Sequence, residues 1–349
     1  MSIRTILSFI LFCTMRTDAD AQSASTDSIV NDTIASPEAR QSLGKHLNEK
    51  LTNIYFNTKY DTNYVIRPKE KWLIKLVGNY SGNHIHAKGT INDIYSRYDL
   101  HTRSNTTIGI WVSYCDLAVE LSVNPEKLSG SNSDYELNLE YHGNRLSVDF
   151  NFLHAMSLTG DMKLGDIDHL NENGLCMNMV SITGYYTFNH RRFSFPAALY
   201  QNYYQRRSAG SWLAGLSFQG GNIKTTDELK KRNPQAPEVR LNIANVAFGG
   251  GYGYNLVLGR QSQWLIHLSA LPSFVVYKHN RLIVNNDEKR DHGFSFNMIF
   301  NERAAVVYHF SSRYLTGASV IMSNAIFNND KVTFKQNKWF TRAFFGMRL

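Results

Sequence analysis

The stretch KWFTRAFFGMRL, residues 338–349, alternates in character from one residue to the next. Its odd positions are mostly apolar: Trp339, Thr341, Ala343, Phe345, Met347 and Leu349. Its even positions include the cations Lys338, Arg342 and Arg348. Because successive side chains of a strand point to opposite faces, the stretch predicts a strand with one apolar and one basic face. An apolar outer face with a charged inner face is typical of a transmembrane β-barrel.

The same period of two recurs from residue 69 onward. The predicted strands lie near residues 69–80, 107–114, 117–124, 134–141, 146–152, 176–188, 211–219, 240–254, 262–276, 293–309, 313–323 and 338–349. They total about twelve, an even number, as single-chain bacterial barrels require. We therefore expect an all-β, antiparallel transmembrane β-barrel of about 12 strands with a short N-terminal helix. A soluble β-sandwich is the alternative, because a half-buried sheet alternates in the same way.

The first residues have the pattern of an export signal. Arg4 precedes an apolar run at residues 6–12, and Ala19 and Ala21 fit the small-residue rule for cleavage. We expect a signal peptide at residues 1–21 and an outer-membrane location. Residues 22–68 are expected to form a flexible lead-in and a short periplasmic helix, with an apolar stripe at Ala39, Leu43, Leu47 and Leu51. Residues 69–349 would form the barrel.

Composition limits the ligands. The formal charge is +8, but no basic helix, zinc spacing or aromatic RNA platform accompanies it. We expect outer-membrane lipid as a partner, no nucleic acid, no metal and no cofactor. Of the cysteines, Cys115 and Cys176 follow the signal peptide. The sequence favours two isolated thiols but leaves a bridge open, because it cannot place them within bonding distance.

Connection lengths test the strand assignment. Outer-membrane barrels alternate long outer loops with short periplasmic turns. The predicted connections follow this rule with one exception, and the long ones include residues 81–102, 155–175 and 278–292. The sequence RRFSFPAALYQNYYQRRSAGS, from Arg191 to Ser211, stands where a short turn is expected. It is basic at both ends and aromatic between. It either folds into the barrel or contacts a periplasmic or envelope protein partner; alternatively, the strand assignment is wrong here.

Several stretches resemble an exported family of Bacteroidetes that is classified as a domain of unknown function, DUF4421. They are GNYSGNHIHAKGTINDIYS at 78–96, LSGSNSDYELNLEYHGN at 128–144, the segment just quoted, GYGYN at 251–255, WLIHLSALPSFVVY at 264–277 and FFGMRL at 344–349. The resemblance implies a porin-like barrel in a bacterial outer membrane. It implies no activity and carries over no site residue.

Strand parity predicts which charges face the lumen. The candidates are Lys71, Lys75, Arg103, Glu120, Asp134, Glu136, Glu140, Asp149, Lys338, Arg342 and Arg348. The acids lie on the third to fifth strands, and the bases lie on the first, second and last strands, which are neighbours in a closed barrel. An open lumen would place a transverse field across a channel. A narrow lumen would let the charges pair, which we favour because small barrels fill with side chains.

Two motifs suggest enzymes, but weakly. His267 and Ser269 have the His-x-Ser spacing of outer-membrane acyl hydrolases, but strand parity turns them inward, and Ala270 stands where those enzymes have Asn. The run GGGYGYN at 249–255 lacks the Lys-Ser/Thr of a phosphate loop. We expect no catalytic residues. The sequence favours a narrow channel or a structural component of the envelope, with a partner-binding assembly component as the alternative and an acyl hydrolase as a remote one.

Overall fold

The computed structural model describes residues 49, 59–91, 94–114, 117–128, 134–164, 167–236, 238–285, 287–291, 297–328 and 332–349. The chain divides into residues 1–50 and residues 51–349, and the second part is the subject below. The predicted signal peptide and all of the predicted N-terminal helix except Glu49, which is helical, lie outside the described residues. Cys115 also lies outside them, and Cys176 is a buried free cysteine.

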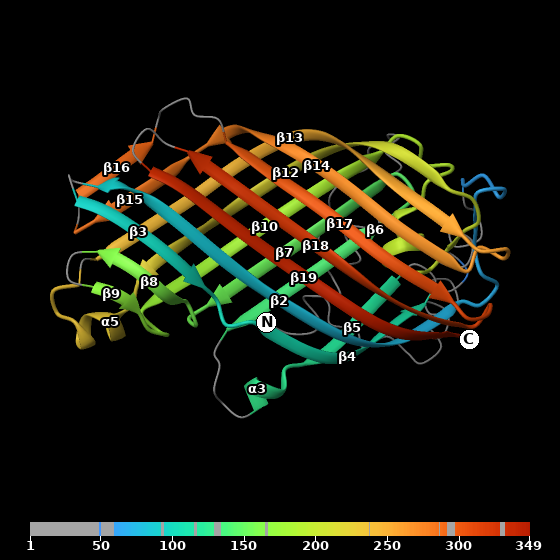
Figure 1. Cartoon of the computed structure of the whole chain (residues 1–349), viewed down its shortest axis with the longest axis horizontal. Coiled ribbons are helices and arrows are strands. Elements are labelled where there is room, and N and C mark those ends of the chain that lie inside the picture. The colour runs from blue at the N-terminus through green and yellow to red at the C-terminus, as the bar shows by residue number, and fades with distance from the viewer. Residues whose placement is uncertain are drawn as a thin grey trace, which may run out of the picture. The chain divides into compact units, whose positions relative to one another are not determined.

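One large antiparallel sheet dominates the described chain (Figure 1). Register pairings run in the order β5 (Leu117–Val123), β4 (Asn105–Tyr114), β2 (Trp72–Ile91), β19 (Val332–Arg348), β18 (Tyr314–Asn328), β17 (Met298–His309), β14 (Trp264–Lys278), β13 (Val239–Leu258), β12 (Ala209–Thr225), β10 (Leu175–Thr187), β7 (Leu146–Ala155) and β6 (Tyr135–His142). The first and last strands of the predicted barrel, β2 and β19, are thus neighbours.

Shorter elements complete the fold. The sheet also includes β3 (Ile94–His101), β8 (Thr159–Leu164), β9 (Ile167–Leu170), β15 (Asn280–Val284) and β16 (Asp287–Asp291). A separate pair is formed by β1 (Val65–Ile66) and β11 (Tyr204–Gln205). The helices are α3 (Pro125–Leu128), α4 (Phe195–Leu199) and α5 (Asp227–Arg232).

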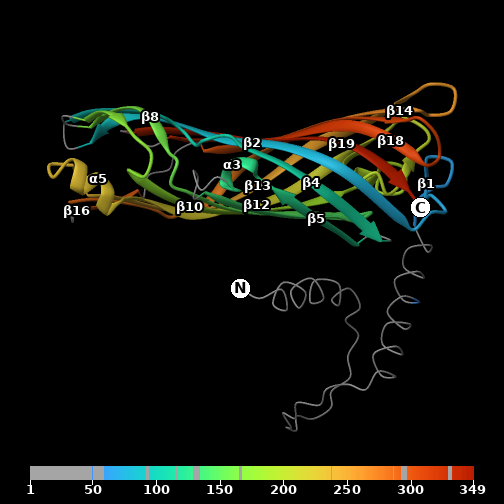
Figure 2. The ribbon, with the colours of Figure 1, turned by 90° about the horizontal axis from the view of Figure 1, so that it is seen from below.

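The sheet curls back over itself. In Figure 2, β2, β18 and β19 run above β5, β10 and β12. The end at which β2 begins and β19 stops is called the terminal end here, and the end that carries β3, β8, β9, β15, β16 and α5 is called the extended end (Figure 1).

The extended end differs from the expectation in one respect. Residues 81–102 were expected to be a long loop, but β2 continues to Ile91 and pairs with β3. Residues 155–175 and 278–292 likewise contain strands β8, β9, β15 and β16. Because these hairpins rise beyond the main sheet, the described sheet has seventeen strands rather than about twelve. The apolar side chains that these strands bury, such as Leu100 and Met162, are few in each strand, so the sequence shows no extended period of two.

The outer face of the curl is apolar. Leu76, Ile110, Leu121, Leu216 and Leu268 are more than half exposed. Aromatic pairs border this surface at the terminal end: Trp72 with Tyr114, Tyr186 with Phe188, Trp212 with Tyr252, Trp264 with Tyr308, and Tyr314 with Phe345. A second group of exposed aromatics lies further along the strands, at Tyr80, Tyr135, Phe248, Phe274 and Tyr277.

These aromatics mark the length of the apolar band. On β2, Trp72 and Tyr80 face the same side, and at roughly 3.3 Å per residue they lie about 26 Å apart along the strand. The ladder between β2 and β4 covers Trp72 to Ser81, the length of about ten residues that a membrane-spanning strand needs. No helix in the described part of the chain is long and apolar enough to cross a membrane.

Candidate functional site

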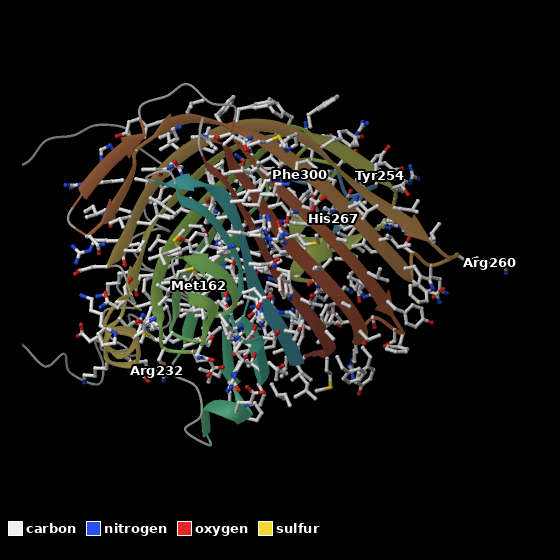
Figure 3. All side chains as sticks on the ribbon, turned by 60° about the vertical axis from the view of Figure 1, so that its left-hand side comes forward. Met162, Arg232, Tyr254, Arg260, His267 and Phe300 are labelled. Atoms are coloured by element: carbon white, nitrogen blue, oxygen red, sulfur yellow. The ribbon has the colours of Figure 1, made fainter. Side chains whose placement is uncertain are left out.

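The inner face of the curled sheet carries the polar side chains. On β2, Lys75 and Asn79 are buried, whereas Leu76 and Tyr80 are exposed. The alternation is the strand period itself. Figure 3 labels an example of each side: His267 of β14 is fully buried, and Tyr254 of β13 is exposed on the outside. The interior of the curl is therefore the place to look for a site.

Residues 188–208, named the inward segment here, fill the terminal end of this interior. The segment joins β10 to β12 and contains α4 and β11. Ser194 caps α4 by accepting a hydrogen bond from the Ala197 N–H, and Pro196 stands in the first turn, where it costs no hydrogen bond. All five residues of α4 are buried. The segment between Arg191 and Ser211 that interrupts the predicted turn pattern thus packs inside the curl.

Aromatic side chains of the inward segment fix its depth. Phe193 and Phe195 are almost completely buried and lie 5.9 and 5.3 Å from the ring of His267. Burial of such a ring is worth roughly 1.5–3 kcal/mol. Gly253 of β13 makes room for Phe193, because a Cβ at residue 253 would lie 2.9 Å from that ring. The GGGYGYN run is therefore a strand with aromatic side chains outside and a packing surface inside.

Lys75 anchors the segment to β2. Its Nζ donates to Gln201 Oε1 at 2.8 Å and to the Tyr200 carbonyl at 3.4 Å. The same ammonium lies 3.6 Å from the ring centre of Trp111, which favours a cation through its negative face. Lys75 is fully buried, so these contacts replace its water shell.

Arg348 holds the segment from β19. Its Nη2 donates to the Gln201 carbonyl at 2.8 Å, and its Nη1 donates to the hydroxyl of Tyr204 and to the Ser312 carbonyl, the latter at 3.2 Å. Only 1% of Arg348 is exposed. Cations from two neighbouring strands thus converge on Gln201.

A third anchor involves the His-x-Ser motif. Asn255 Nδ2 donates to the Ser194 carbonyl at 2.9 Å and to Gln205 Oε1 at 3.0 Å. Its Oδ1 lies 2.7 Å from His267 Nδ1, and His267 Nε2 lies 3.0 Å from Ser269 Oγ. The order Ser–His–Asn resembles a nucleophile, a base and an orienting group. Here Asn255 donates hydrogen bonds to the inward segment, and His267 packs against Phe193 and Phe195. These contacts attach the inward segment to the wall.

A layer of ion pairs crosses the interior beyond the inward segment. Arg342 of β19 places Nη2 2.8 Å from Glu120 of β5 and Nη1 3.8 Å from Glu140 of β6. Lys338 lies 3.4 Å from Glu136. Basic and acidic strands thus face and pair with one another, which is the arrangement expected for a narrow lumen.

The layer includes a pair that sequence reasoning missed. Arg303 of β17 donates to Asp149 of β7 and also to the Tyr185 hydroxyl at 2.6 Å. Arg303 lies within a predicted strand, and its parity relative to exposed Val306 indicates an inward side chain. His142, His309 and Gln201 are further buried interior groups that were not among the candidates, whereas His267 is buried as its strand parity predicts.

Three predicted lumen charges lie apart from this layer. Asp134 accepts hydrogen bonds from the Met156 and Ser157 N–H groups at 2.6 and 3.0 Å, and so secures the start of β6 to the end of β7. Arg103 forms a half-exposed pair with Glu172 at 3.0 Å at the extended end. Lys71 precedes β2 at the terminal end and is partly exposed.

A cavity of about 90 Å³ adjoins the ion pairs on the side of the extended end. Its lining comes mainly from β6, β7, β10, β12, β17, β18 and β19 and includes Glu140, Asp149, Arg303 and Lys338. A smaller cavity of about 20 Å³ lies nearby and is lined by Ser81, Asp134 and Glu136, among others. In the part of the chain that the structure describes, no group of three or more His, Cys, Asp or Glu side chains could hold a metal ion.

The sequence matches a known protein family. The domain of unknown function DUF4421 matches residues 59–348, which include all the strands described above. This chain belongs to the DUF4421 family. For this DUF4421 protein, a comparison with curated proteins found no match.

Solved structures with some likeness are barrel proteins of outer membranes. The outer membrane protease OmpT from Escherichia coli has 6% identity and a TM-score of 0.37, over 81% of this chain and 99% of that one. The β domain of the Bordetella autotransporter BrkA has 9% identity and a TM-score of 0.33, over 78% and 100%. The P. putida toluene transporter TodX has 7% identity and a TM-score of 0.25, over 81% and 91%. Likenesses this distant carry no argument about the DUF4421 protein.

Proposed function

We propose that this DUF4421 protein is an outer-membrane β-barrel whose lumen is a narrow channel, closed at the terminal end by the inward segment. The apolar outer face between two groups of aromatic side chains suits a lipid bilayer. Arg342 bridges Glu120 of β5 and Glu140 of β6. This contact supports closure of the sheet between those two strands.

The polar contacts of the inward segment support a channel over a purely structural barrel. The inward segment meets the wall through hydrogen bonds from Lys75, Arg348 and Asn255 as well as through apolar packing. In a hydrated lumen, water can replace such hydrogen bonds when the segment moves, because a protein hydrogen bond contributes only about 1 kcal/mol net. The observation that carries the proposal is this polar attachment of a segment that blocks one mouth.

Conductance in planar bilayers tests the proposal. The refolded mature protein is compared with a variant in which a short Gly/Ser linker replaces residues 191–207. Folding of each is checked by the heat-dependent gel shift. We expect rare, brief openings of the wild type and steady conductance steps of the variant. A folded variant that never conducts would overturn the channel and leave a sealed structural barrel.

A second candidate is a partner-binding component of the outer membrane. The solvent side of the inward segment exposes Arg191, Arg192, Arg206 and Arg207. Asp61 lies 3.6 Å from Arg192. This basic cluster favours an acidic envelope partner.

Replacing these four arginines by Gln tests the second candidate. The matched control replaces Lys230, Lys231 and Arg232 of α5, at the extended end. We expect an envelope partner recovered by the wild type and the control to be lost with the four-Gln variant. Equal recovery by all three would exclude the cluster as the binding surface. A hydrolase remains the least supported reading, because Asn255, His267 and Ser269 are used inside the curl.

A further inference from the structure

The cavity of about 90 Å³ beside the ion pairs has unsatisfied polar atoms in its lining. The buried atoms Arg303 Nη1, Asn301 Nδ2 and Gln219 Oε1 have no hydrogen-bond partner within the described residues. Arg303 and Asn301 lie on the same face of β17, two residues apart, and Gln219 comes from β12. A buried polar group without a partner costs about 1–3 kcal/mol. An occupant of the cavity should therefore accept hydrogen bonds from Arg303 and Asn301 and donate one to Gln219.

The charges around the cavity are already compensated. Arg303 pairs with Asp149, Lys338 with Glu136, and Glu140 with Arg342. An ion that entered would lose its hydration and find no uncompensated partner. The free Nη1–H of Arg303 is thus a directional donor rather than an open anion site. This balance favours an uncharged occupant.

The lining is amphipathic. Ser181, Thr183 and Ser217 line one side with hydroxyl groups, whereas Ile299, Ile321 and Phe340 line another with apolar surface. A solute that combines hydroxyl groups with a short carbon skeleton can satisfy both sides. A cavity of about 90 Å³ has room for several water molecules, and therefore for a short-chain polyol.

We propose that the cavity is a binding site for a small, uncharged polyol, with Asn301 and Arg303 as donors and Gln219 as acceptor. The proposal deepens the channel function and rests on it for its biological meaning. The site lies between the extended end and the ion-pair layer. A solute that enters the lumen from the extended end would bind there before it reaches the inward segment.

Saturation-transfer NMR on the refolded mature protein in deuterated detergent tests the site. The probes are glycerol and erythritol, with mannitol as a longer polyol for comparison. Asn301→Leu and Gln219→Leu each remove one polar group from the lining. Asn245→Leu is the matched control, because Asn245 is buried opposite Gln219 in the register but does not line the cavity. The gel shift confirms that each variant is folded.

We expect transfer to glycerol or erythritol and an affinity about fivefold lower in both lining variants, since one lost hydrogen bond is worth about that factor. Asn245→Leu should bind as the wild type does. Absence of transfer to either small polyol, or equal transfer in Asn301→Leu and Asn245→Leu, would overturn the proposal and leave water as the occupant. Binding without any conductance in the bilayer experiment would retain the site and remove the channel.

Discussion

Lys75 Nζ and Gln201 Oε1 are 2.8 Å apart, although 126 residues separate them in the sequence. This hydrogen bond joins a fully buried cation of the wall to the segment that fills the terminal end. Gln201 also receives Arg348 at its carbonyl oxygen, and its φ of 61° lies in the left-handed region, which non-glycine residues rarely adopt. The wall contacts therefore hold the inward segment in a backbone conformation that it would not favour alone.

Replacing Lys75 by Met should loosen the inward segment. The change retains the apolar stem but leaves Gln201 Oε1 without its donor, at a cost of about 1–3 kcal/mol. Such a loss raises the open fraction of the lumen roughly fivefold to 150-fold. Single-channel recording measures this fraction. Lys335→Met, at an exposed position of β19, is the control and should behave as the wild type. Equal open fractions of the two variants would show that Lys75 does not hold the inward segment in place.

Gly253→Ala should displace Phe193. The new Cβ would lie 2.9 Å from the Phe193 ring and 3.3 Å from Ser269 Cβ, so the ring must move. We expect a loss of about 1 kcal/mol or more in the free energy of unfolding, as for other overpacked interiors, together with more frequent channel openings. Gly250→Ala, whose Cβ would meet only the Leu213 carbonyl at 3.7 Å, serves as the control. Urea titration in lipid vesicles measures both, and equal stabilities would refute the close fit.

The hairpin of β2 and β3 should open in acid. Asp99 accepts a hydrogen bond from His84 Nε2 at 2.5 Å, and this bond, followed by the charges of His84 and His86, lowers the pKa of Asp99. His84 of β2 and Asp99 of β3 lie beyond the ladder that joins β2 to β4. Because the folded pKa lies below the unfolded value of about 3.9, the stabilisation is complete above that value and is lost as the pH falls through the folded pKa.

Hydrogen exchange of the β3 amides as a function of pH follows this opening. In the wild type, protection of the hairpin relative to the β2–β4 ladder should fall below about pH 4. Asp99→Asn should remove that step, with lower protection already at neutral pH. The exposed Asp161→Asn variant should retain it. A step of unchanged size in Asp99→Asn would assign the acid response to another group.

Much of the wall could be predicted from the sequence because it depends on strand parity alone. Exposed Trp72 and Leu76 flank buried Lys75, and exposed Phe345 follows buried Phe344, as alternation requires. The hairpins of the extended end could not be predicted in this way. Ile85 is buried in an apolar cluster with Leu100 and Met162, and these three residues come from three different strands. Within each strand the neighbouring residues, such as His84 and His86 of β2, are polar, so the sequence of one strand alone shows no apolar face.

The site was predictable only in part. The missing short turn after β10 pointed to residues 191–211, and parity pointed to Arg342 and Glu120. Which charges meet could not be predicted, because Arg342 and Glu120 are 222 residues apart and their contact depends on how far the sheet curls. The partner of Arg303 could not be predicted either, because Asp149 is 154 residues away and lies on the opposite side of the curl. The contacts of Gln201 depend on a local backbone turn that no periodic pattern encodes.

The pair of Arg303 and Asp149 should be the strongest coupling in the ion-pair layer. Arg303 is 3% exposed at its side chain, and the pair links β17 to β7. Removing either partner alone by Arg303→Met or Asp149→Leu should cost about 3–5 kcal/mol, because it leaves a buried charge uncompensated. The double variant should cost clearly less than the sum. A double-mutant cycle from urea unfolding in lipid vesicles measures the coupling.

The exposed pair of Arg232 and Glu228 on α5 provides the comparison for that cycle. Both side chains are nearly half exposed, and pairs of this kind are worth about 0.3–0.5 kcal/mol. If Arg303→Met cost no more than Arg232→Met, the interior would be hydrated enough to screen its charges. The ion-pair layer would then be a hydrated constriction of the lumen that does not stabilise the fold. Neutralising Arg303 should in that case change the ion selectivity of the channel and leave the free energy of unfolding unchanged. The cycle and a selectivity measurement on the same variants therefore separate a rigid barrel from an open charged lumen.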